Sequence, residues 1–75
     1  MVINFSRHAK RRAKLYDISE LDIENFLSDL DLKEGEHKLI EDFPGFKYPI
    51  TIVVSVENDI ITVITNYPLK KGRKK

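Results

Sequence analysis

Residues 50–67 read ITIVVSVENDIITVITNY, and this stretch decides the expected fold. β-Branched residues fill both halves, a composition typical of β-strands. The polar residues Glu57-Asn58-Asp59 separate the halves and predict a tight turn. Pro49 and Pro68 flank the stretch, and proline is found at strand ends rather than in strand interiors. The stretch therefore predicts an antiparallel β-hairpin.

The length of the loop sets the register of this hairpin. A two-residue loop at Asn58-Asp59 places Glu57 opposite Ile60 and sorts the side chains onto two faces. The expected core face carries Ile50, Ile52, Val54, Val56, Ile61, Val63, Thr65 and Tyr67. The other face carries Thr51, Val53, Ser55, Thr62, Ile64 and Asn66 and is expected to line a shallow groove. A longer loop would exchange the two faces.

Two helices are predicted upstream of the hairpin. Ser6 is a suitable N-cap for a helix from Arg7 to Tyr16, and Ser19 for a second helix that ends near residues 30–32. The small or apolar positions of the first helix form a single narrow stripe, which implies close packing: Ala9, Ala13 and Tyr16. The apolar face of the second consists of Ile23, Phe26, Leu27 and Leu30.

The 75 residues predict one α+β domain over residues 1–69, followed by a basic segment at 70–75. We expect two N-terminal helices packed on a small antiparallel sheet of three or four strands, in which residues 2–5 and 37–43 supply the further strands. The chain has no cysteine, so disulfides and thiolate zinc sites are excluded. No apolar run reaches the length of a membrane span and the N-terminus is unlike a signal peptide, which predicts a cytoplasmic protein without a membrane partner.

Charge is strongly segregated along the chain, although the formal net charge is only +1. Ten of the 13 basic residues lie in residues 7–14 and 70–75, and ten of the 12 acidic residues lie in residues 17–42. Two basic ends that meet in space would bind a polyanion, most commonly a nucleic acid. The candidate binding residues are Arg7, Lys10, Arg11, Lys14, Lys70, Lys71 and Arg73. The alternative is a solvated surface paired with the acidic segment.

Residues 5–19 contain Phe5-Ser6-Arg7-His8-Ala9-Lys10-Arg11-Arg12, followed by Ile18-Ser19, and the last strand ends in Tyr67-Pro68. These motifs resemble a family of small bacterial and archaeal domains of unknown function. Members of that family open with Phe-x-x-His-Ala-x-x-Arg, and the family is related to the RelE/BrnT toxins. The resemblance implies a RelE/barnase-like fold and RNA cleavage, with RNA, the ribosome or an antitoxin-like protein as partners. Tyr16-Asp17 stands where that family has Arg-Gly.

His8, Arg12 and Tyr67 are the candidate catalytic residues. His8 and Arg12 are four residues apart and share a helix face. A histidine can transfer a proton and an arginine can bind phosphate, as metal-independent cleavage of RNA requires. Tyr67 would stack on a base or assist proton transfer. The alternatives are a capping or packing role for His8, an ion pair with an acidic residue of the second helix for Arg12, and a packing role for Tyr67.

No cofactor or metal is expected. Two histidines without cysteine do not predict a structural zinc site. Asp29, Asp31 and Glu34 offer carboxylates for magnesium, and the alternative is a solvated acidic surface. Three functions stay open: an RNA-directed domain that is a RelE-like endoribonuclease toxin, a non-catalytic nucleic-acid-binding module, and a protein-interaction domain.

Overall fold

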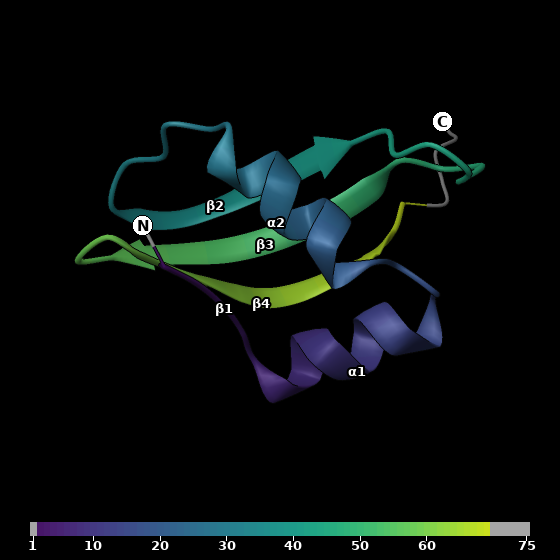
Figure 1. The fold of residues 1–75 in the computed structure, drawn as a ribbon, viewed down its shortest axis with the longest axis horizontal. Helices are drawn as coiled ribbons and strands as arrows, with labels where there is room; N and C mark the ends of the chain where they lie inside the picture. Colours follow the sequence, from purple (N-terminus) through teal and green to yellow (C-terminus); the bar gives the residue numbers. More distant parts are fainter. Residues whose placement is uncertain (1, 70–75) are drawn as a thin grey trace.

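The computed structural model describes residues 2–69, which form an α+β fold of two helices and one four-stranded sheet (Figure 1). The elements in chain order are β1 (Val2–Phe5), α1 (Arg7–Leu15), α2 (Glu20–Ser28), β2 (Gly35–Glu41), β3 (Ile50–Glu57) and β4 (Ile60–Pro68). The α+β class expected from the sequence is confirmed, and both serine N-caps form as predicted.

The sheet is mixed, so the prediction of an antiparallel-only sheet is wrong. Its strand order is β1-β4-β3-β2, in which β1 runs parallel to β4 and the other pairs are antiparallel. The antiparallel strands β2, β3 and β4 leave the outer edge of β4 free. β1 fills the first part of that edge, with Val2 opposite Ile60 and Phe5 opposite Val63.

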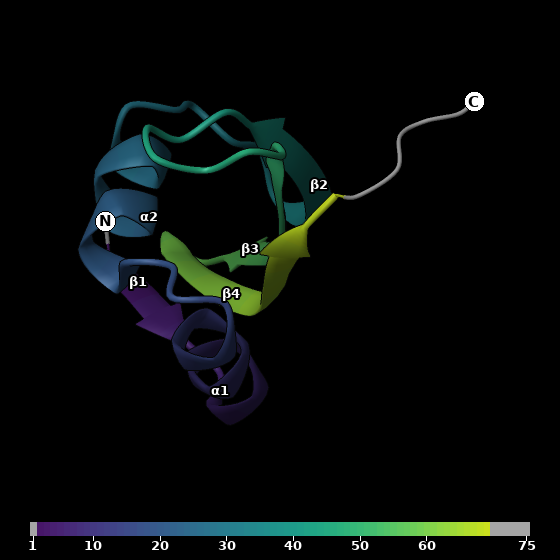
Figure 2. The same ribbon diagram turned by 90° about the vertical axis from the view of Figure 1, so that its right-hand side faces the viewer.

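The two helices occupy different positions relative to the sheet. Figures 1 and 2 show α2 across one face of the curved sheet, whereas α1 lies beside β4 at its outer edge. The prediction that both helices pack on one face is therefore only half right. Ala9 and Ala13 are buried against β4, and their small side chains allow the helix to approach the strand closely.

The hairpin begins as predicted. Asn58 and Asp59 form a two-residue turn with φ angles of 52° and 64°, and Glu57 lies opposite Ile60. Two positive φ angles are the signature of a type I′ turn, whose twist matches that of the flanking strands. Glu34 supports the turn from outside, because its Oε2 accepts a hydrogen bond of 2.7 Å from the Asn58 backbone N–H.

A β-bulge then changes the register in the second half of β4. Val54 still lies opposite Val63, but Val53 lies opposite Thr65, so Ile64 has no partner in the ladder. The extra residue moves the following side chains to the opposite face. The predicted placement of Thr65 and Tyr67 on the core face is therefore wrong. The fully buried Asn66, opposite Ile52, takes the place predicted for Thr65, and Pro68, opposite Ile50, takes the place predicted for Tyr67.

Three hydrogen bonds join the residues around this bulge to the start of α1, and a fourth caps the helix. The Ser6 backbone N–H donates to the Val63 carbonyl (2.9 Å), and the Ser6 Oγ–H donates to the Ile64 carbonyl (2.9 Å). Ser6 Oγ also accepts from the Ala9 N–H (3.0 Å) as the N-cap. Asn66 Nδ2 donates to the Ala9 carbonyl (3.2 Å). Ser6 thus caps the helix and satisfies the carbonyl that the bulge frees from the ladder.

One apolar core lies between α2, α1 and the sheet. It is built from Ala9, Ala13, Ile18, Ile23, Leu27, Phe43, Ile50, Ile52, Val54, Val56, Ile61 and Val63. α2 ends at Ser28, earlier than predicted, because the chain tightens into a bond from the Leu30 N–H to the Leu27 carbonyl (3.1 Å). Leu30 still packs on the core. β2 starts and ends two residues earlier than predicted, which leaves Phe43 free to turn into the core.

The double role of Ser6 gives a prediction about stability. Ser6→Ala should lower the free energy of unfolding by about 1–3 kcal/mol, since it removes a helix cap and leaves the Ile64 carbonyl without its partner. The matched control, Ser19→Ala, removes only an exposed cap on α2 and should cost about 0.5–1 kcal/mol. Urea denaturation of both variants measures the difference. Equal costs would show that the bond to Ile64 contributes nothing.

Candidate nucleic-acid interface

The outer surface of α1 is cationic. Arg7, Lys10, Arg11 and Lys14 are exposed, and no acidic residue lies in the helix. We call these four side chains the cationic surface of α1. Only the narrow alanine stripe is buried, so nearly the whole circumference of the helix remains open to a partner. Lys14 also lies in the last turn, where the helix dipole favours a positive charge.

The cationic surface rests on a firmly held helix. The hydrogen bonds from Ser6 and Asn66 fix the first turn of α1 to β4, and Ala9 and Ala13 pack without flexible side chains. A charged group on a rigid element loses less conformational freedom on binding than one on a mobile loop. The four charges are therefore held in a fixed array before any ligand arrives.

The structure places two of the three candidate catalytic residues on one side of α1. His8 is exposed, and the half-buried Arg12 lies one turn further along. Arg12 Nη1 donates a hydrogen bond of 3.4 Å to the phenolic oxygen of Tyr16. Tyr16 was assigned to the packing stripe from the sequence, although its spacing of four residues from Arg12 could have indicated the contact.

The bulge turns the Tyr67 side chain to the other face of β4. It lies opposite Thr51, on the sheet face away from the core, and is half-buried. Within residues 2–69, no hydrogen bond joins Tyr67 to His8 or Arg12. The tyrosine that the structure brings to Arg12 is thus Tyr16, and a catalytic role for His8, Arg12 and Tyr67 stays a prediction.

The second basic run lies outside the described residues, and with it the candidates Lys70, Lys71 and Arg73. The described chain leaves β4 at Pro68, and the Leu69 N–H donates to the Pro49 carbonyl (2.7 Å). α1 and β4 run in the same direction, side by side (Figure 1). The second run therefore starts from the end of the strand that carries α1.

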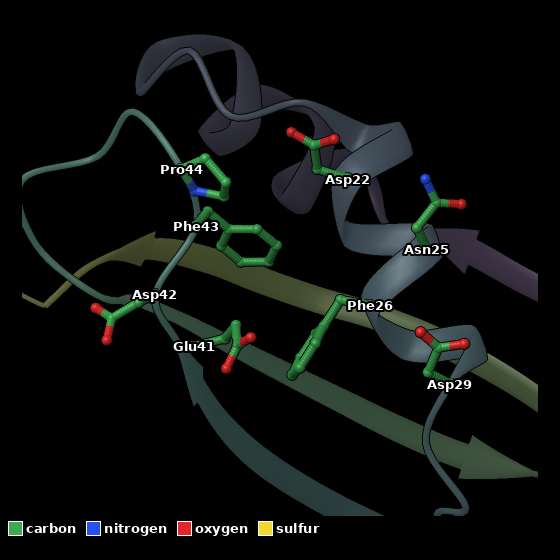
Figure 3. Close-up of a pocket in the computed structure, with 8 residues that line it drawn as sticks. All are labelled: Asp22, Asn25, Phe26, Asp29, Glu41, Asp42, Phe43 and Pro44. Carbon is green, nitrogen blue, oxygen red and sulfur yellow. The ribbon is translucent and has the colours of Figure 1, made fainter.

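A hollow of about 500 Å³ lies elsewhere, between α2 and residues 41–44 (Figure 3). The rings of Phe26 and Phe43 meet edge to face inside it, with centroids 5.7 Å apart and planes at 79°. Four carboxylates surround the rings: Asp22, Asp29, Glu41 and Asp42. The sequence indicated an acidic surface over residues 17–42 but gave no sign that two phenylalanines 17 positions apart would form the floor of a hollow.

Two of the three carboxylates considered for magnesium lie apart: Asp29 lines the hollow, and Glu34 lies at the hairpin turn. Glu34 accepts the hydrogen bond from Asn58 at the hairpin turn. His37 Nε2 lies 2.6 Å from the Lys33 carbonyl, a contact that joins β2 to the chain just before it. Among residues 2–69, no group of three or more histidine or carboxylate side chains is placed to hold a metal ion.

Comparison with known proteins gives no relative: no family model, curated protein or solved structure matches this chain. Neither of the two helices in residues 2–69 is long and apolar enough to cross a bilayer.

The exposure of His8 makes it a clean functional probe. His8→Ala should change the free energy of unfolding by less than about 0.5 kcal/mol, because the His8 side chain is exposed and makes no hydrogen bond within residues 2–69. Chemical denaturation of the variant, with the exposed Asn4→Ala as the control, provides the measurement. A loss above about 1.5 kcal/mol would show that His8 has a structural role.

Proposed function

We propose that this domain binds RNA through the cationic surface of α1. The observation that carries the proposal is the array of four exposed cations on a helix that contains no acid and is fixed to the sheet. Arg7, Arg11 and Lys14 follow one helical stripe at spacings of four and three residues. At 1.5 Å per residue this stripe is about 10 Å long, and at one phosphate per ~3.4 Å it covers about three nucleotides of one strand.

The choice of RNA rests on the resemblance of residues 5–19 to the domains related to the RelE/BrnT toxins. The element order β1-α1-α2-β2-β3-β4 supports a RelE/barnase-like arrangement as the finer description of this fold. Lys70, Lys71 and Arg73 would add non-specific contacts to phosphate, since they follow the strand beside which α1 lies.

Salt dependence tests the binding surface. Arg11→Ala/Lys14→Ala should weaken binding of a single-stranded RNA and should reduce the slope of log K against log salt by about 1.4, because two phosphate contacts are lost at ~0.7 each. Lys33→Ala/Lys38→Ala removes the same charge from exposed positions outside α1 and is the control. Fluorescence anisotropy over a range of salt concentrations measures both. Equal effects of the two pairs would reject α1 as the binding surface.

A second candidate is metal-independent cleavage of the bound RNA, which would make the protein a ribonuclease toxin with an antitoxin-like partner. One observation favours it: His8 and Arg12 lie on one side of α1, next to the phosphate-binding array, and Arg12 is held by Tyr16. His8 would transfer the proton of the attacking 2′-hydroxyl, and Arg12 would stabilise the negative charge on the phosphate.

Cleavage has a direct test. The purified protein should cut RNA in the presence of a chelator, and His8→Ala should abolish cutting while binding is retained. Gel analysis of free RNA and of messenger RNA on ribosomes is the measurement. Absence of cleavage in both settings would reject the enzymatic candidate and leave the binding proposal standing.

A further inference from the structure

The hollow between α2 and residues 41–44 combines an aromatic floor with an acidic rim. Phe26 and Phe43 form the floor. Asp22 in α2 and Asp29 just after it lie across from Glu41, the last residue of β2, and Asp42, which follows it (Figure 3). No lysine or arginine lines the hollow. Such a surface suits lysine and arginine side chains, whose methylene groups pack on apolar rings while their charged ends meet carboxylates.

A cationic segment of this chain starts close by. Pro68 lies opposite Ile50, and Ile50 lies opposite Glu41, so these three residues form one row across the sheet. At ~4.8 Å between neighbouring strands, Pro68 is about 10 Å from Glu41. Residues 70–75 read KKGRKK, and a six-residue segment reaches about 20 Å when extended. The segment after Leu69 can therefore reach the rim of the hollow.

We propose that residues 70–75 bind in the acidic hollow of their own molecule. The hollow, of about 500 Å³, has room for two or three side chains of an extended segment. The short connection through Leu69 also gives the segment a high effective concentration at the rim.

If the segment docks, the carboxylates of the hollow compete with a polyanion for the side chains of Lys70, Lys71 and Arg73. This consequence rests on the proposed RNA binding, but docking itself does not. A segment held by the carboxylates is unavailable to phosphate, and its release at higher salt or on contact with a stronger polyanion would expose it.

The test needs no RNA. Gly72 is the only glycine in residues 70–75, and its backbone amide gives an NMR signal for the whole segment. In the full chain at low salt, the steady-state heteronuclear NOE of Gly72 should be close to the values of β4. In Asp29→Asn/Glu41→Gln/Asp42→Asn it should fall to the values of a free segment. The control Asp31→Asn/Glu36→Gln/Glu57→Gln removes the same charge from exposed positions outside the hollow and should keep the high NOE.

Trypsin gives a second measurement. Cleavage after Lys70 should be about fivefold faster in the hollow variant than in the control, if the segment is docked about four-fifths of the time. A low NOE for Gly72 in the unmodified chain, or equal NOE and cleavage rates in the two triple variants, would overturn the proposal. Protection that grows with protein concentration would also overturn it, since the occupant would then be the segment of a second copy.

Discussion

The hydrogen bonds between the β4 bulge and Ser6 fix the position of α1, and the arrangement of charge in this domain depends on them. A bulge leaves a residue out of the strand ladder, and here the freed carbonyl belongs to Ile64. Ser6 Oγ donates to that carbonyl and at the same time caps α1. One side chain, 58 residues away in the sequence, therefore satisfies the carbonyl that the bulge frees and also caps the helix.

Because α1 is attached at the edge of β4, it presents nearly all of its surface to solvent. A helix laid across the sheet would bury a broad apolar face, as α2 does with Ile23 and Leu27. The edge position needs only Ala9 and Ala13 to be buried, and the remaining positions are free to carry charge. The short alanine side chains, the edge position and the cationic surface are thus three consequences of one packing arrangement.

The sequence predicted those parts of the fold that depend on near neighbours. The two serine caps, the two-residue turn at Asn58-Asp59 and the pairing of Val54 with Val63 follow from local residue chemistry and were confirmed. The bulge was not predictable in this way, because Ile64 gains its hydrogen bond from a residue far away in the sequence. Strict alternation of side chains therefore predicted Thr65 opposite Ile52 in the core, where the structure has Asn66.

The same distinction applies to the candidate site. The cations of α1 could be assigned from the sequence, since a helix with an alanine stripe must turn its other residues outward. The contact of Arg12 with Tyr16 and the hollow around Phe26 and Phe43 required the packed structure. Asn66 shows why: it is fully buried, and one of its two polar atoms finds no partner in the described chain. The hydrogen bond from Asn66 Nδ2 to the Ala9 carbonyl attaches α1 to β4 and offsets part of the cost of burying the unpaired oxygen.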